Sequence, residues 1–209
     1  MIEVHGGEEF TALPSPYVRE RYLGYLEMGA DIVVGHHPHV PLNYELTGGK
    51  AVFYSLGNFI FDTNYQRTQL DTDKGALLRI DFSEDGFSFE TLGTRLDRAA
   101  ERVCAGPLPD IFTEVPAEEY ALLIDTAAAA FLQNEKKRAR FMMKGEGDGY
   151  TEEQWENYFR NEPLVPYVQP GVHNDFGLLY DMALSADPSK FASSRLEKVK
   201  ANILRQIEG

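Results

Sequence analysis

Histidines are concentrated at the start of this chain, where their spacing suits a metal ion. Four of the five histidines fall within the first 39 residues: His5 stands alone, and His36, His37 and His39 follow Gly35 as a cluster. Neutral imidazole is the commonest metal ligand near physiological pH. Three neighbouring buried imidazoles would otherwise leave several ring nitrogens in need of partners. The cluster therefore favours metal binding or catalysis, whereas His5 taken alone is more typical of a hydrogen-bonded structural residue.

The elements before each histidine group are expected to bring the groups together. Residues 1–4 are predicted as a strand, 17–28 as a helix and 30–34 as a buried, β-branched strand. This order predicts a βαβ unit with parallel strands. Ligands of open α/β sheets bind beyond the carboxyl ends of the strands, where both histidine groups stand. In an extended segment, His37 and His39 would project to the same side and reach one ion together.

The rest of the chain changes from α/β to antiparallel strands and then to helices. Glycine-containing turns predict two hairpins, over residues 43–56 and 76–92. Proline-rich breaks predict a linker over 107–116 and a loop over 163–171. Runs of helix formers predict helices over 117–143, from 151 onward and over 188–207. We therefore expect an α/β (α+β) chain with a domain portion over 1–106 and a helical appendage over 107–209.

Composition narrows the classes of partner. The chain has 20 basic and 33 acidic residues, and its formal net charge of −13 argues against nucleic acid as a partner. No apolar run is long enough for a membrane span, and no signal peptide is recognised at the start. Cys104 is the single cysteine, so a CxxC metal site is excluded.

Four blocks of sequence stand in order within residues 1–62: His5–Phe10, Pro14–Pro16, Gly29–Val40 and Phe53–Asp62. Together they resemble the CapA family of capsule synthesis proteins, which are related to calcineurin-like metallophosphoesterases. This resemblance implies a partial metallophosphoesterase sandwich, of which this chain holds the C-terminal portion. It also implies a role in capsule, poly-γ-glutamate or cell-envelope polymer biosynthesis, in the cell envelope or outside the cell.

The resemblance also implies metal ligands. A strand-end histidine and a His-x-His pair of the superfamily match His5, His37 and His39. His36 is then left to contact the substrate or to stabilise developing charge. This register can shift by one position, because His36 also follows Gly35 directly.

Three polar residues are further candidates. Glu8 is a candidate for catalysis, and Asn58 and Asp62 for substrate binding. A solvated loop acid is an equally good interpretation of Glu8, as are turn-forming or capping roles for Asn58 and Asp62.

The expected cofactors are divalent metal ions, Mn, Zn or Fe. The family's two-metal site also needs an early Asp motif and an Asn-His motif, and neither is found in this sequence. We therefore expect a single or weak ion unless a preceding segment or a partner chain completes the domain. A short opening strand, predicted to be central and buried, points in the same direction.

Three functions remain open at this stage. The first is a metal-dependent hydrolase acting on a phosphoester or on an amide of an anionic polymer. The second is a non-catalytic polymer-binding or assembly factor with a structural or vestigial metal site. The third is a fragment without independent function.

Overall fold

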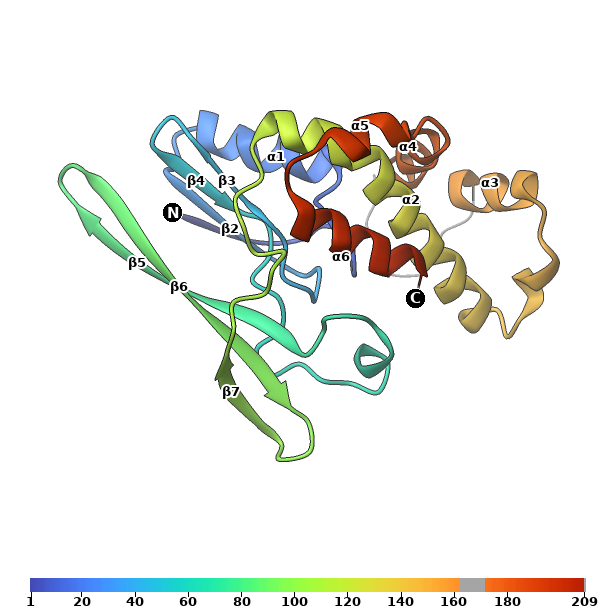
Figure 1. Cartoon of the computed structure of the whole chain (residues 1–209), viewed down its shortest axis with the longest axis horizontal. Helices are drawn as coiled ribbons and strands as arrows, with labels where there is room; N and C mark the ends of the chain where they lie inside the picture. The colour runs from blue at the N-terminus through green and yellow to red at the C-terminus, as the bar shows by residue number, and fades with distance from the viewer. Residues whose placement is uncertain (162–171, 209) are drawn as a thin grey trace. The chain divides into compact units, whose positions relative to one another are not determined.

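The computed structural model describes residues 1–161 and 172–208 and divides the chain into two compact units, Met1–Ala117 and Glu118–Gly209 (Figure 1). The boundary predicted from the sequence lies before the proline-containing segment 107–116, whereas the boundary between the compact units lies after it.

The first unit opens with the predicted strand, helix and strand: β1 (Ile2–His5), α1 (Pro16–Glu27) and β2 (Ile32–His36). β1 and β2 pair in parallel, which places His5 opposite His36. The Oγ of Ser15 caps α1 by accepting a hydrogen bond from the Val18 amide. β1 lies at the edge of a sheet of order β1-β2-β4-β3, and three of its four residues are exposed. The prediction of a buried central strand is therefore wrong for β1.

Both predicted hairpins form. β3 (Tyr44–Thr47) and β4 (Lys50–Phe53) are joined through Gly48 and Gly49, whose φ angles of 56° and 77° suit glycine. β4 also pairs in parallel with β2 and so completes the four-stranded sheet. β5 (Lys74–Ser83) and β6 (Gly86–Asp97) form the second hairpin, and β7 (Arg102–Gly106), which the sequence analysis did not predict, adds a third antiparallel strand.

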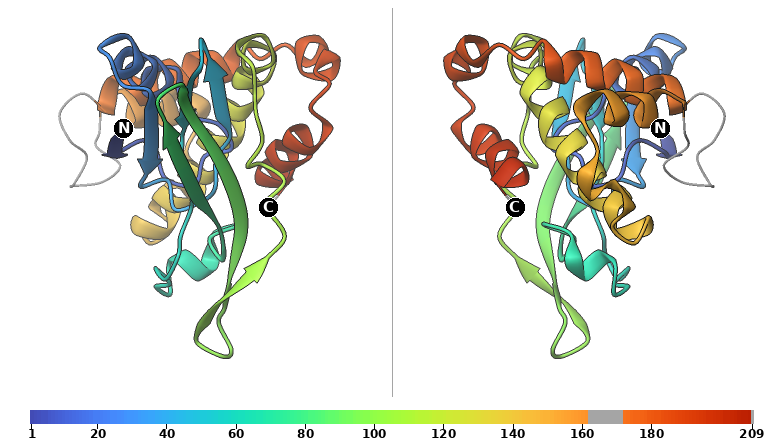
Figure 2. Two further views of the ribbon diagram at one scale, coloured as in Figure 1. Left: turned by 90° about the vertical axis from the view of Figure 1, so that its left-hand side faces the viewer. Right: turned by 90° about the vertical axis from the view of Figure 1, so that its right-hand side faces the viewer.

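Two apolar clusters cover the two faces of the four-stranded sheet. Alternation along β2 directs Val33 to the α1 side, with Tyr22 and Val52. It directs Ile32 and Val34 to the other side, where side chains of the β5–β6 hairpin pack. Figure 1 and the two views of Figure 2 show α1 and the hairpin on either side of this sheet.

The predicted linker over 107–116 contributes to this core instead. Ile111, Phe112 and Val115 are buried, and the Val115 amide donates to the Tyr44 carbonyl at 2.9 Å. The prediction of a linker is wrong because the apolar side chains of this segment pack against β3 and the aromatic cluster around Phe53.

The second unit is helical as predicted. Its described helices are α2 (Ala117–Met142), the short 3₁₀ helix η2 (Glu146–Gly149), α3 (Glu152–Asn161), α4 (Val172–Leu184), α5 (Pro188–Ser193) and α6 (Glu197–Glu208). The predicted final helix is two helices, because Ser194 is extended with ψ 137° and ends α5. No helix was predicted at α4, and the loop predicted over 163–171 lies outside the described residues. Taken together, the α/β start, the antiparallel hairpins and the helical C-terminal region confirm the predicted fold class.

Candidate metal centre

The histidines meet where β1 and β2 end at the same edge of the sheet. His5 is the last residue of β1 and His36 is the last residue of β2. The loop after β1 is tied across the histidine segment by two backbone hydrogen bonds, Gly6 N to His36 O and Phe10 N to Pro38 O, both 2.9 Å long. These bonds place the loop residues between His5 and Phe10 against the histidines.

The backbone at His37 and His39 is left-handed, not extended. Their φ angles are 104° and 62°, a region that costs non-glycine residues about 1–3 kcal/mol each. The extended segment predicted here is therefore wrong. The two rings nevertheless lie near each other, with centroids 5.7 Å apart. Such strain persists only where the surrounding contacts impose it, and it is concentrated at functional sites.

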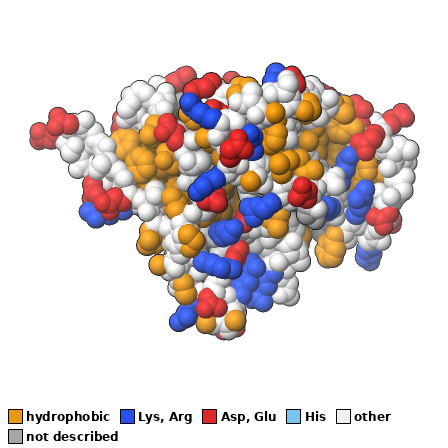
Figure 3. Space-filling model, in the orientation of Figure 1, with side chains coloured by type: hydrophobic (Ala, Val, Ile, Leu, Met, Phe, Trp, Pro, Cys, Tyr) orange, Lys and Arg blue, Asp and Glu red, His pale blue; other side chains and the backbone are white. Residues whose placement is uncertain are grey.

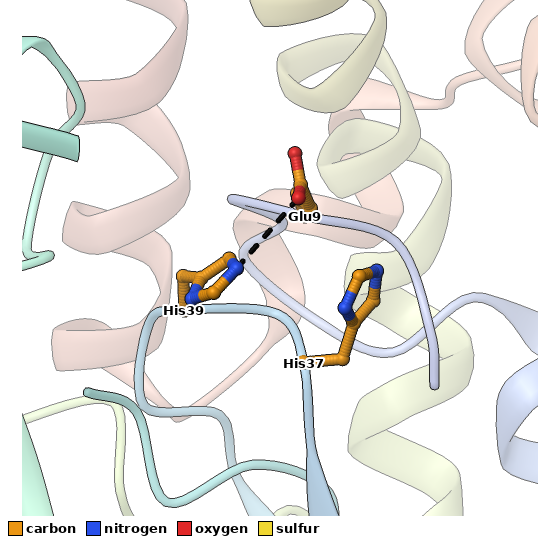
Figure 4. A group of neighbouring side chains, drawn as sticks. All are labelled: Glu9, His37 and His39. Atoms are coloured by element: carbon orange, nitrogen blue, oxygen red, sulfur yellow. Dashed lines mark ion pairs between the residues drawn. The ribbon is translucent and has the colours of Figure 1, made fainter. Parts of the chain in front are cut away.

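Glu9 joins the two histidines to form a group of potential metal ligands. One ligand atom from each of Glu9, His37 and His39 lies within 4.8 Å of the others, and all three side chains are half-buried (Figure 4). The Glu9 Oε1 and His39 Nε2 atoms are 3.7 Å apart. Imidazole and carboxylate together suit Zn, Mn and Fe ions. The donor set therefore fits the expected cofactors.

His5 lies beside this group. Its Nε2 is 3.2 Å from the Nδ1 of His37, and the ring centroids are 4.9 Å apart. Two nitrogens bound tetrahedrally to one ion at about 2.0–2.1 Å would be about 3.3 Å apart. His5 and His37 are thus spaced as two ligands of one ion would be, and His37 adjoins both His5 and the Glu9–His39 pair.

His36 occupies a different position. It follows Val34 by two residues on β2, so strand alternation directs both side chains to the sheet face away from α1. Burial lowers the pKa of His36, and the nearby His5 lowers it further while Glu3 raises it. His36 therefore adjoins His5 but is not a member of the Glu9 group.

The surroundings of His37 favour the neutral form that a metal ligand needs. Burial lowers its pKa, and the neighbouring His5 and His39 lower it further, against an opposite effect of Glu9. A neutral imidazole offers a lone pair to an ion without first losing a proton.

The side chains of Glu8, Asn58 and Asp62 are engaged with the protein itself. Glu8 is buried and accepts a hydrogen bond from Ser15 Oγ at 2.8 Å. Asn58 is buried, and its Oδ1 is 2.9 Å from the Nδ1 of His39. The roles of Glu8 in catalysis and of Asn58 in substrate binding stay predictions.

Asp62 forms ion pairs with Arg67 at 2.9 Å and Arg98 at 2.9 Å. Desolvation alone would raise its pKa, but the hydrogen bonds to the two arginines lower the pKa below its ordinary value. Figure 3 shows basic and acidic side chains close together on the face that it presents, in keeping with such pairs. A substrate-binding role for Asp62 also stays a prediction.

Glu9 was missed by the sequence analysis, which selected the adjacent Glu8. Positive φ angles at Gly7 (108°) and Phe10 (60°) bend this loop, so that Glu8 turns into the core and Glu9 turns toward the histidines. The sequence alone does not show which of two adjacent glutamates faces the histidines.

The fold and the cluster together define an α/β protein with potential metal ligands at the carboxyl ends of parallel strands. Residues 1–63 match the family described as bacterial capsule synthesis protein PGA_cap. This N-terminal part of the chain is thus similar to the CapA-type capsule synthesis family, as the resemblance implied.

Two Bacillus proteins are similar to the same region. Over 69 residues, or 33% of this chain, it is 42% identical to the "Capsule biosynthesis protein CapA" of Bacillus anthracis and to the "PGA biosynthesis protein CapA" of Bacillus subtilis (strain 168). The matched region covers 17% and 18% of those relatives, so the chain spans only a small part of their length.

Across residues 1–161 and 172–208, no helix combines the length and the apolar composition needed to cross a membrane.

Proposed function

We propose that residues 1–117 form part of a metal-dependent hydrolytic site that acts in capsule or cell-envelope polymer metabolism. The observation that carries the proposal is the convergence of Glu9, His37 and His39, whose ligand atoms lie within 4.8 Å at the carboxyl ends of parallel strands. The family match and the names of the two Bacillus relatives support the biological setting. A place of action in the cell envelope is part of the same proposal.

A bound divalent ion would lower the pKa of a coordinated water and so supply a nucleophile near neutral pH for a phosphoester or a γ-glutamyl amide. The residues of the chain would hold and orient that ion. His37, whose pKa burial lowers, would offer a lone pair, and Glu9 would contribute the negative charge that neutral imidazoles lack. His36, close to His5 and outside the ligand group, is the candidate for stabilising the developing negative charge, because burial favours its neutral ring, which can still donate a hydrogen bond.

The ligand count favours a single ion. A two-metal site needs bridging carboxylates, with metals about 3.5–4 Å apart. Among the described residues, the candidate group contains one carboxylate, Glu9, with His37 and His39. The same observation supports the second candidate function, a polymer-binding or assembly factor in which one ion has a structural role.

Metal titration of the whole chain tests the site. The metal-free protein, titrated with Mn²⁺, Zn²⁺ and Fe²⁺ under anaerobic conditions, should bind one equivalent of at least one of them. His37→Ala and His39→Ala should each weaken binding at least tenfold. His36→Ala is the matched control and should bind as the wild type does. Equal affinity in all four proteins would end the assignment of ligands.

Hydrolysis distinguishes the two functions. The metal-loaded chain is assayed with a simple aryl phosphate, an aryl phosphodiester and a γ-glutamyl anilide. Hydrolysis that disappears in His37→Ala supports the hydrolase. Metal binding without turnover of any of the three favours the assembly factor.

A further inference from the structure

Asn58 was predicted to bind substrate, yet the residue is only 6% exposed and its polar side-chain atoms face protein groups. Its Nδ2 lies 3.1 Å from the Thr72 carbonyl oxygen and 3.0 Å from the Gln66 Oε1. A backbone carbonyl can only accept a hydrogen bond, so the atom facing Thr72 must be the amide nitrogen. This fixes the orientation of the Asn58 amide.

The orientation of Asn58 determines which nitrogen of His39 carries the hydrogen. The Oδ1 of Asn58, 2.9 Å from the Nδ1 of His39, can only accept, so Nδ1 must donate. In neutral His39 the lone pair then resides on Nε2. That atom is 3.7 Å from the Glu9 carboxylate, another electron-pair donor, so the two atoms face each other as ligands of a shared cation would.

The His39 ring is also held in its plane by aromatic neighbours. Phe61 stacks on it at 4.9 Å with an interplanar angle of 15°, and Phe10 at 6.0 Å with an angle of 25°. The network behind Asn58 continues through Thr72, whose Oγ1 accepts from Arg98 at 3.1 Å. The ring therefore has both a fixed plane and a fixed hydrogen position before any ion binds.

We propose that Asn58 is a positioning residue that selects the Nδ1–H tautomer of His39 and thereby presents Nε2 to the metal centre. This inference rests on the proposed metal site. Hydrogen bonds of this kind, made by the second nitrogen of a ligating histidine, orient the ring and commonly change metal affinity 10- to 100-fold when removed.

The tautomer is measured in the metal-free chain. Long-range ¹H–¹⁵N correlation spectra at about pH 8, where an ordinary imidazole is neutral, separate the two tautomers of His39. The wild type should show Nδ1–H. Asn58→Leu removes the acceptor and should shift His39 toward Nε2–H. Asn58→Asp keeps an oxygen acceptor for His39 and should retain Nδ1–H, although it loses the donor to the Thr72 carbonyl and should lower the stability of the protein.

Zn²⁺ alone is the probe for affinity, measured by competition with a chelator. Asn58→Leu should lower Zn²⁺ affinity at least tenfold, and Asn58→Asp should restore it. Asn43→Leu is the matched control: Asn43 is also buried, and its side-chain atoms have no hydrogen-bond partner within the described part of the chain. It should change neither the tautomer nor the affinity. Asn58→Ser, too short to reach His39, carries the same expectation as Asn58→Leu if the leucine variant does not fold.

The two readouts separate this inference from the proposed function. An Asn58→Leu or Asn58→Ser protein that folds, keeps Nδ1–H on His39 and binds Zn²⁺ as the wild type does would overturn the inference. A tautomer shift in a protein that binds no metal at all would leave Asn58 as the residue that sets His39 but would end the metal-site proposal.

Discussion

Gly35→Ala should disrupt the strand that carries the histidines. A Cβ at Gly35 would lie 2.2 Å from the carbonyl oxygen of Tyr54 and 2.8 Å from the Cε2 of Tyr22. Carbon–oxygen contacts are normally about 3.3 Å or longer, so the Tyr54 carbonyl would have to move by about 1 Å. That oxygen belongs to the backbone, which continues β4, and β4 pairs with β2. The contact therefore has to be relieved by separating two paired strands.

The cost follows from that separation. A shift of about 1 Å takes a hydrogen bond of about 2.9 Å beyond bonding distance, and each lost bond costs about 1 kcal/mol. Overpacking against Tyr22 adds about 1–3 kcal/mol. With one or two ladder bonds lost, we expect Gly35→Ala to lower the free energy of opening of this sheet by about 3 kcal/mol and to weaken metal binding, since His36 and His37 follow directly.

Hydrogen exchange, followed by mass spectrometry of peptides from β2 and β4, is the suitable assay. Fluorescence of Trp155 would report on the second unit. Gly24→Ala is the matched control: it is the same change within α1, a Cβ there meets nothing within 4 Å, and it should stabilise the helix by about 0.5–1 kcal/mol. A Gly35→Ala protein whose β2 amides open within about 0.5 kcal/mol of the wild type would refute the reasoning.

Three further predictions test other parts of the first unit. Measured by chelator competition, Glu9→Gln should weaken Zn²⁺ binding at least tenfold, whereas Glu8→Gln at the adjacent position should not. Weaker binding in Glu8→Gln than in Glu9→Gln would show that the wrong acid has been assigned to the site. Arg19→Leu should lower the free energy of unfolding, measured by hydrogen exchange, by about 3 kcal/mol, because it leaves the 5% exposed Glu45 without its two hydrogen bonds at 2.6 and 2.8 Å. Arg19→Lys should have an intermediate stability. An Arg19→Leu protein as stable as the wild type would contradict this reasoning. Burial, with smaller contributions from nearby groups, raises the pKa of Tyr22 to about 12. The unfolded chain loses that proton near pH 10, so stability should fall by up to about 2.7 kcal/mol as pH rises from about 10 to 12. In urea titrations, the unfolding free energy of Tyr22→Phe should not show this loss between about pH 10 and 12. An identical pH dependence of stability in both proteins would exclude a contribution from Tyr22.

The order of elements in the first unit could be predicted from local signals. Ser15-Pro16 marks the start of α1, and the β-branched run at Ile32–Val34 marks a buried strand. The paired glycines between β3 and β4 likewise specify a turn. Each of these signals lies within a few residues of the structure it specifies, so no tertiary contact is needed to interpret it.

Other features depended on contacts between distant residues. The segment 107–116 looks like a linker until Phe112 is placed against Phe53, at a stacking distance of 6.2 Å. β7 is short and becomes recognisable only by pairing with β6. In both cases the stabilising partner is remote in sequence, and local propensity carries no information about it.

The sequence by itself determined which residue types could bind a metal and that they stand at the ends of two neighbouring strands. Only the tertiary structure decided which of them come together. It turned Glu9 rather than Glu8 toward the cluster and placed His36 outside it. It also assigned Asn58 to the ring of His39. The physical reason is that side-chain direction in a loop follows φ angles that the surrounding packing and hydrogen bonds impose, here at His37, His39 and Phe10, and residue identity alone does not specify them.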